Sequence, residues 1–180
     1  GLCGEDAFAT DVKISSIGAE FMLNVKGEEP VLCHTVLLGK HNISNICLAA
    51  AIAYELGLTL PEISAGISRL TAVEHRLSVT KTSAGITIID DSYNSNARGF
   101  DAALEVLKSF AGRKIVITPG LVELGATEDL ENYNLGKKLA NACDIAVLVG
   151  RSACLTIKSG LIENGFDPDC VIQATTLSKQ

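Results

Sequence analysis

The residues best suited to chemistry follow a short apolar segment at positions 86–89. There the sequence Ile-Thr-Ile-Ile is followed directly by Asp90, Asp91, Ser92, Tyr93, Asn94, Ser95 and Asn96. The β-branched, mostly apolar segment predicts a strand that is buried on both faces of a parallel sheet. Ligands of open α/β sheets bind outside the carboxyl ends of the strands, so these carboxylates and amides are candidates for ligand binding. The local alternative is that they form Asx turns and cap the next helix.

A second pair of amides, Asn42 and Asn45, lies at the start of an Ala-rich helix expected over Ile46–Leu56. A carboxamide offers one acceptor and two donors, which match the mixed donor and acceptor edge of adenine. The spacing of three places both amides near the first helical turn, where backbone N–H groups lack partners. The alternative for Asn42 is a simple N-cap. His41 has no partner that the sequence makes visible, and an isolated histidine is more often structural.

Arg76 lies in a segment without periodicity, residues 71–77, which we take as the boundary between domains at 1–75 and 76–180. A guanidinium in a linker could reach phosphates that one domain holds from a position set by the other. The alternative is a surface ion pair with Glu74 or another acid.

The elements expected to position these residues change character at that boundary. Before it, β structure precedes two helices, the second with Thr59 as a possible N-cap. After it, strands alternate with amphipathic helices, which predicts an α/β fold with right-handed βαβ units and a mostly parallel sheet. Further strand exits at 119–125 and 150–152 should open on the same sheet edge as Asp91, although both could be ordinary turns. The expected strands are 11–17, 20–25, 31–38, 77–82, 86–91, 114–118, 144–149 and 170–173, and the expected helices are 46–56, 61–70, 97–110, 127–142 and 152–164.

Composition excludes several classes of protein. The 180 residues are 47% hydrophobic and carry a net charge of -6, with no basic stripe, so a nucleic-acid partner is not expected. No run of eighteen apolar residues and no secretory leader is visible, so neither a membrane span nor secretion is expected. The six cysteines are too widely spaced for zinc or Cys-x-x-Cys motifs. Those on expected helices read as small core residues in a reducing compartment, which favours the cytoplasm: Cys47, Cys143 and Cys154.

No complete phosphate loop occurs in the sequence. Gly39-Lys40 fails the Walker pattern because that pattern requires Ser or Thr after the lysine, whereas His41 follows here.

Four short motifs in order resemble the Mur ligase family, the ATP-dependent amide-forming enzymes of peptidoglycan precursor synthesis. Asp-Asp-Ser-Tyr-Asn-x-Asn is most similar to the MurF type within it. Ala97-Arg98-Gly99 follows where that type commonly has a Pro and a Ser, so the resemblance does not assign the residues of the dipeptide pocket. The motifs are Gly39-x-His41-Asn42-x-x-Asn45, Val73-Glu74-His75-Arg76-Leu77, Asp90-Asp91-Ser92-Tyr93-Asn94-Ser95-Asn96 and Val122-Glu123-Leu124-Gly125.

The resemblance implies the end of a central ATP-binding domain followed by a Rossmann-like C-terminal domain. It implies adenine binding by Asn42 and Asn45, phosphate binding by Arg76, and a ribose or hinge role for Asp91. It also places the nucleotide and incoming-dipeptide side of the cleft at Tyr93, Asn94 and Asn96. The implied reaction adds D-alanyl-D-alanine to a UDP-MurNAc-tripeptide through an acyl phosphate, with ATP and Mg²⁺.

Two expectations follow about activity. The resemblance places the phosphate loop and the magnesium ligands upstream of Gly1, so the 180-residue chain is expected not to turn over ATP alone. The alternative function is a non-catalytic Rossmann-like module that binds a nucleotide or a partner protein. A thiol redox protein would need paired or exposed cysteines of low pKa, of which the sequence gives no sign.

Overall fold

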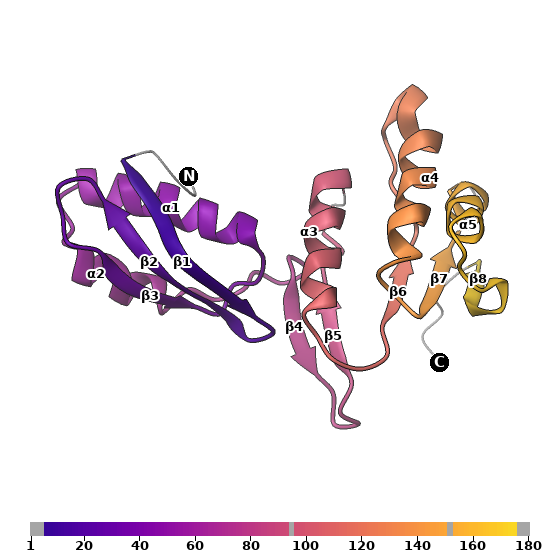
Figure 1. Ribbon diagram of the computed structural model, residues 1–180, viewed down its shortest axis with the longest axis horizontal. Helices are drawn as coiled ribbons and strands as arrows, with labels where there is room; N and C mark the ends of the chain where they lie inside the picture. Colours follow the sequence, from indigo (N-terminus) through magenta and orange to yellow (C-terminus); the bar gives the residue numbers. More distant parts are fainter. Residues whose placement is uncertain (1–5, 94–95, 151–152, 176–180) are drawn as a thin grey trace. The chain divides into compact units, whose positions relative to one another are not determined.

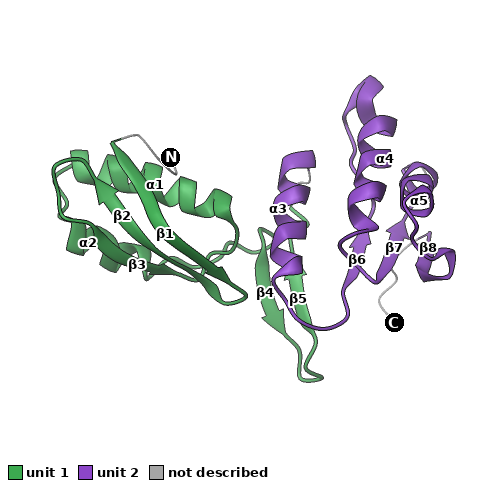
Figure 2. Ribbon diagram, in the orientation of Figure 1, with its two compact units in different colours: residues 1–93 green, residues 94–180 purple. Residues whose placement is uncertain are grey.

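The computed structural model describes residues 6–93, 96–150 and 153–175. The chain forms two compact units, residues 1–93 and 94–180 (Figure 2), and each is described by itself. The domain boundary expected at 75/76 lies inside the first unit and stays a prediction.

The first unit is built on an antiparallel sheet in the order β1-β2-β3. Alternate residues of β2, such as Phe21 and Leu23, are fully buried, as expected for a strand with one face on a core. Two helices, α1 and α2, lie on that face (Figure 1) and supply Ile43, Cys47 and other apolar side chains to the same core. The elements are β1 (Ala7–Ser15), β2 (Gly18–Val25), β3 (Val31–Thr35), α1 (Lys40–Glu55) and α2 (Leu60–Ile67).

The two helices begin at different kinds of signal. Helix α1 begins at Lys40, six residues before the expected start at Ile46, because its first turn is polar and apolar periodicity does not report it. Gly39, its N-cap, has φ of 87°, which glycine adopts without steric cost. Helix α2 confirms Thr59 as the N-cap: its backbone N–H donates to Glu62 Oε2 at 2.9 Å.

The strand before the Asp90-Asp91 pair belongs to a hairpin. Strand β5 (Thr87–Asp90) pairs antiparallel with β4 (Ser78–Lys81), with Ser78 opposite Asp90. The prediction of a parallel strand buried on both faces is therefore wrong for this segment, and Ile88 is 47% exposed. A β-branched apolar run predicts a strand but does not specify the direction of its neighbour, which the turn closed by Thr82 and Ile86 decides here.

The second unit confirms the predicted α/β alternation and the parallel sheet. Strands β6, β7 and β8 are parallel neighbours in that order. Its elements are α3 (Ala97–Lys108), β6 (Ile115–Thr118), a 3₁₀ turn (Gly125–Thr127), α4 (Glu128–Leu139), β7 (Ile145–Val149), α5 (Cys154–Glu163), a 3₁₀ turn (Pro168–Cys170) and β8 (Val171–Ala174).

The core of the second unit lies between the sheet and its helices (Figure 1). Leu148 of β7 and Leu139, Ile157 and Leu161 of the helices have at most traces of exposed surface. On the other sheet face Ile117 remains exposed. The described helices therefore cover one face of this parallel sheet.

The cysteines of both units behave as core residues rather than as reactive thiols. Cys33, Cys47 and Cys154 are buried and free, and burial raises the pKa of each thiol. Cys143 lies after the end of α4 rather than on the expected helix, and burial raises its pKa to about 11. A thiolate is therefore disfavoured at these four positions. Within the described ranges, no helix has both the length and the apolarity that crossing a bilayer requires.

Candidate functional site

The first two turns of α1 carry two of the predicted site residues. Asn42 is not the N-cap, which is Gly39, and its side-chain amide donates to the carbonyl oxygen of Leu38 at 2.8 Å. Its backbone N–H donates to the carbonyl oxygen of Gly39 at 3.1 Å. Asn45 lies one turn further along the helix and is exposed. The alternative of a capping role for Asn42 is thus wrong, whereas the role of both amides in adenine binding stays a prediction.

Arg76 lies between two residues with unfavourable backbone conformations. His75 has φ of 63° and Leu77 has φ of 50°. Each such residue costs on the order of 1–3 kcal/mol and persists only where neighbouring contacts hold it. Strained residues on both sides of Arg76 indicate that neighbouring contacts restrict the direction in which its side chain leaves the backbone.

The residues at the end of β5 and just after it, 90–93, supply the contacts that hold the strained segment 75–77. We call residues 90–93 the exit of β5. The backbone N–H of Tyr93 donates to the carbonyl oxygen of His75 at 3.1 Å, and Asp91 Oδ1 accepts from the backbone N–H of Leu77 at 3.1 Å. His75 Nδ1 lies 2.7 Å from Asp90 Oδ2. Three contacts thereby bind two residues of this segment, His75 and Leu77, to the exit of β5.

Arg76 itself contacts an aromatic ring. Its guanidinium carbon lies 4.3 Å from the centroid of the Tyr93 ring, which is the geometry of a cation–π contact. In the part of the chain that the structure describes, Arg76 forms no ion pair with Glu74. The side chains of Arg76 and Tyr93 are both exposed, so the guanidinium keeps N–H donors that face solvent and are available to an anion.

The two neighbouring carboxylates differ in their electrostatics. The pKa of Asp90 is lowered, first by hydrogen bonds from Ser92 and then by the contact with His75. The pKa of Asp91 is raised because the half-buried carboxyl group loses hydration, although His41 and Arg76 act in the opposite direction. Asp91 is therefore the less stable of the two anions, and a ligand that donates hydrogen bonds to it would relieve that cost.

The start of α1 lies next to this segment. A methyl group added at Gly39 would lie 3.7 Å from Leu77 Cδ1 and 2.8 Å from the His41 ring. Since His41 also influences Asp91, the first turn of α1, the strained segment and the exit of β5 lie together within the first unit. The group combines the Arg76 guanidinium, the Asp91 carboxylate and, in the first turn of α1, the amide of Asn42. Those are the partners of nucleotide phosphates, ribose hydroxyls and adenine, respectively.

The comparisons with known proteins identify the family. A family model described as Mur ligase, glutamate ligase domain, matches residues 75–175. The chain belongs to the Mur ligase family. Among curated relatives, the UDP-N-acetylmuramoyl-tripeptide–D-alanyl-D-alanine ligase of Escherichia coli is 34% identical over 170 residues, which are 93% of this chain and 37% of that protein. The chain thus spans little more than a third of the length of this relative.

Solved Mur ligase structures share the fold. A crystal structure of MurF from Acinetobacter baumannii matches 96% of this chain and 37% of its own with a TM-score of 0.85 and 28% identity. MurF of Thermotoga maritima, solved in complex with ADP, matches 97% of this chain and 38% of its own with a TM-score of 0.79 and 21% identity. The predicted membership of the family and the α/β fold with a mostly parallel sheet are confirmed.

The remaining predicted residues of this Mur ligase chain are less informative. Asn94 lies outside the described residues. Asn96 is the N-cap of α3, and its Oδ1 accepts from the backbone N–H of Gly99 at 2.9 Å, as the capping alternative proposed. Tyr93 is exposed and is engaged with Arg76. A role in binding the substrate stays a prediction for all three residues.

No metal site is formed by the described part of this Mur ligase chain: nowhere in it do three His, Cys, Asp or Glu side chains converge. The carboxylates near Arg76 are instead engaged in hydrogen bonds with Leu77, Ser92 and His75. These residues therefore do not fit a magnesium site, and we assign them no coordination of Mg²⁺.

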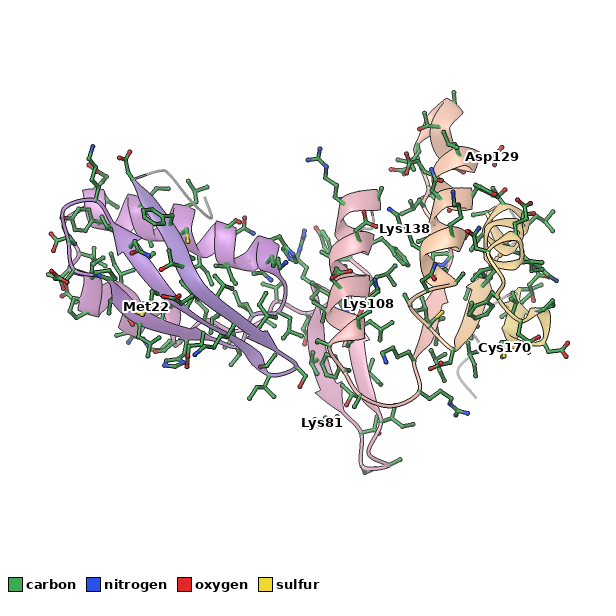
Figure 3. All side chains as sticks on the ribbon, in the orientation of Figure 1. Met22, Lys81, Lys108, Asp129, Lys138 and Cys170 are labelled. Carbon is green, nitrogen blue, oxygen red and sulfur yellow. The ribbon has the colours of Figure 1, made fainter. Side chains whose placement is uncertain are left out.

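An open groove of about 550 Å³ lies in the second unit, away from all the predicted site residues. Two lysines that line it, Lys108 on α3 and Lys138 on α4 (Figure 3), form ion pairs with Glu105 at 3.1 Å and Asp101 at 2.6 Å. The paired acids also line the groove, so ion pairs neutralise two of its three lysines, Lys108 and Lys138.

Histidines 41 and 75 are the residues near this site that sequence reasoning undervalued. Both stand inside motifs that the sequence made visible, next to Asn42 and Arg76. Only their position within a motif could have indicated that these histidines matter, because Asp90 and Asp91, with which they interact, lie far away in the sequence.

The raised pKa of Asp91 predicts an unusual result for Asp91→Asn. The folded protein holds the proton of the Asp91 carboxyl group more tightly than the unfolded chain does. Ionisation of this group therefore lowers the free energy of unfolding as the pH rises from the ordinary carboxyl pKa of 3.8 through the raised pKa of the folded state. Asparagine keeps the oxygen that accepts from Leu77 and removes the charge. We expect Asp91→Asn to be as stable as the wild type or more stable at neutral pH, with the gain vanishing below the ordinary pKa. Urea unfolding at several pH values measures this, and a clear loss of stability at neutral pH would contradict it.

Proposed function

We propose that this chain is part of an ATP-dependent ligase that joins D-alanyl-D-alanine to UDP-N-acetylmuramoyl-tripeptide in the cytoplasm. The observation that carries the proposal is 34% identity to the Escherichia coli ligase of that name across 93% of the chain. The grouping of Arg76, Asp91 and the first turn of α1 within one unit supports a nucleotide-binding role for this part of the protein.

Each residue has a role that its chemistry allows. Arg76 binds a phosphate of ATP through guanidinium donors that are not occupied by the Tyr93 ring. Asp91 accepts hydrogen bonds from ribose hydroxyls or acts in the hinge between domains, while Asn42 and Asn45 bind the adenine edge. Tyr93, Asn94 and Asn96 keep the substrate-side role that the family resemblance implies.

The nucleotide is a substrate in this reaction. ATP transfers its terminal phosphoryl group to the substrate carboxylate to give an acyl phosphate, and the amine of the dipeptide displaces phosphate from it. The phosphate loop and the Mg²⁺ ligands belong to parts of the ligase other than these residues. The contribution of this chain is positioning: it holds the nucleotide so that the reacting groups meet in line.

The function is tested by a chimaera in which this chain replaces the matching part of the Escherichia coli ligase. We expect the chimaera to form UDP-MurNAc-pentapeptide from the tripeptide, D-alanyl-D-alanine and ATP, and the 180-residue chain alone not to hydrolyse ATP. Liquid chromatography of the nucleotide product and a phosphate-release assay measure the two activities. A folded chimaera that binds ADP but forms no amide bond would indicate the nucleotide-binding module instead.

Arg76→Ala in the same chimaera tests the phosphate contact. A charge-assisted hydrogen bond contributes about 1.5–3 kcal/mol, so the KM for ATP is expected to rise at least about tenfold. Arg69→Ala is the matched control, because Arg69 is another exposed arginine of the first unit and lies outside the proposed site. An equal KM for ATP in both variants would remove Arg76 from the site.

A further inference from the structure

His75 makes the shortest contact that crosses from the strained segment to the exit of β5. Its Nδ1 lies 2.7 Å from Asp90 Oδ2, and the hydroxyl of Ser92 lies 3.4 Å from the same nitrogen. Asp90 is itself oriented, since its other oxygen accepts from the backbone N–H of Ser92 at 3.0 Å. The carboxylate is therefore fixed from one side by its own turn before it meets the imidazole.

The position of this pair in the chain gives it a consequence beyond its own energy. His75 directly precedes Arg76, and Asp90 directly precedes Asp91, so the pair joins the two backbones one residue before each proposed nucleotide residue. Beyond it, the Leu77–Asp91 and His75–Tyr93 hydrogen bonds continue the same connection into the ladder that starts with Ser78 opposite Asp90. Loss of the pair would leave the strained conformation of His75 with less to hold it.

We propose that His75 and Asp90 are positioning residues: their contact holds segment 75–77 against the exit of β5 and so fixes the directions of the Arg76 guanidinium and the Asp91 carboxylate. This rests on the proposed function for the role of Arg76 and Asp91, whereas the positioning itself is measurable without any nucleotide.

The chain contains a matched pair for comparison. His34 Nδ1 lies 3.5 Å from Glu20 Oε2 across strands β2 and β3, and the exposed fractions of its side chains, 61% and 37%, are close to the 55% and 35% of His75 and Asp90. This pair joins two strands that a continuous ladder already holds. Its removal therefore measures what an exposed histidine–carboxylate contact contributes where backbone hydrogen bonds already hold the two strands in place.

The experiment compares five variants of the 180-residue chain by amide hydrogen exchange, one of them the double variant His75→Ala/Asp90→Ala. His75→Ala and Asp90→Ala remove the contact from either side. His75→Asn keeps a nitrogen donor near the Nδ1 position and tolerates positive φ better than most residues, so it is the conservative variant. His34→Ala is the control.

Exchange at the amides of Leu77 and Tyr93 is the decisive measurement. We expect it to accelerate about three- to fivefold in His75→Ala and Asp90→Ala, as fits an exposed histidine–carboxylate contact, and no further in the double variant. His75→Asn and His34→Ala should exchange like the wild type at both amides, and the amide of Phe21 in the core should be unchanged in all variants. The upfield ring-current shift of the Arg76 side-chain protons, caused by the Tyr93 ring, should shrink in the same two variants.

Two results would overturn the positioning role: unchanged exchange at both amides in His75→Ala, or equal acceleration at Phe21, which would mean general destabilisation. Titration of the Escherichia coli chimaera with ADP separates this from the function, because the chimaera supplies the rest of the nucleotide site. If the unsubstituted chimaera binds ADP, His75→Ala in it should weaken binding about three- to fivefold and His75→Asn should not. If exchange shows the local coupling but His75→Ala and Arg76→Ala leave the affinity of the chimaera for ADP unchanged, the positioning stands and the nucleotide role of this chain fails.

Discussion

Replacement of Gly160 by alanine is expected to lower the free energy of unfolding of the second unit by about 2 kcal/mol. Gly160 on α5 faces Gly136 on α4, and both are buried. A methyl group at Gly160 would overlap the carbonyl oxygen of Tyr133 and would lie 3.1 Å from the Cα atom of Gly136. These are backbone atoms, so no side-chain rotation makes room, and the helices must move apart.

The magnitude follows from two opposing terms. Overpacking of a well-packed core costs about 1–3 kcal/mol, and a clash with backbone belongs at or above the top of that range. Alanine regains about 1 kcal/mol of helix propensity over glycine. The separation also loosens the contact of Ile157 and Leu161 with Leu139, which have no exposed surface at present. Urea unfolding followed by the amide signals of α4 and α5 measures the net effect.

Gly66→Ala is the matched control for this substitution. Gly66 also lies within a helix, α2, but a methyl group there would have no neighbour within 4 Å. The same chemical change should therefore stabilise the first unit by about 0.5–1 kcal/mol. An unchanged or increased stability of Gly160→Ala would show that α4 and α5 do not approach as closely as described.

Asn132→Leu is expected to destabilise the second unit by about 3–5 kcal/mol. Asn132 is 1% exposed and binds the loop after β6 from both sides. Its Oδ1 accepts from the backbone N–H of Leu121 at 2.8 Å, and its Nδ2 donates to the carbonyl oxygens of Leu121 at 2.8 Å and Glu128 at 3.0 Å. Leucine has a similar volume but leaves the buried N–H and carbonyl groups of Leu121 without these partners, each at a cost of about 1–3 kcal/mol, whereas the Glu128 carbonyl keeps its hydrogen bond within α4.

Asn141→Leu provides the comparison for that loss. Asn141 also donates from its side chain to a carbonyl oxygen four residues back, at 3.1 Å from Lys137, but it is exposed, so water replaces the bond. Its replacement should change stability by less than about 0.5 kcal/mol. Equal effects at 132 and 141, measured by urea unfolding, would contradict the role of Asn132 in holding the loop that leads to Val122–Gly125.

Local patterns in the sequence were sufficient to locate most secondary structure. The strand at 114–118, the helix at 97–110 and the Thr59 cap were predicted within a few residues, because a strand, an amphipathic helix and a cap each depend on neighbours in the chain. The start of α1 was the exception. Its first turn contains polar residues, and the spacing of apolar residues cannot distinguish a polar helical turn from a polar loop.

Pairing and close approach were decided by tertiary structure. The segment before Asp90 is apolar and β-branched whether its neighbour is parallel or antiparallel, so only the hairpin with β4 determined its direction. The short distance between Gly136 and Gly160 was equally invisible, because a glycine in a helix looks unfavourable until the facing backbone is known.

The candidate site divides along the same line. Residue type and motif order, which the chain displays directly, singled out Asn42, Arg76 and Asp91 as candidates. The contacts of His75 with Asp90, fifteen residues apart, and of Asn132 with Leu121, eleven apart, appeared only in the folded chain. Side-chain chemistry is a property of the residue and can be read from the sequence, whereas a hydrogen-bond partner is a property of the path that brings two distant segments within about 3 Å.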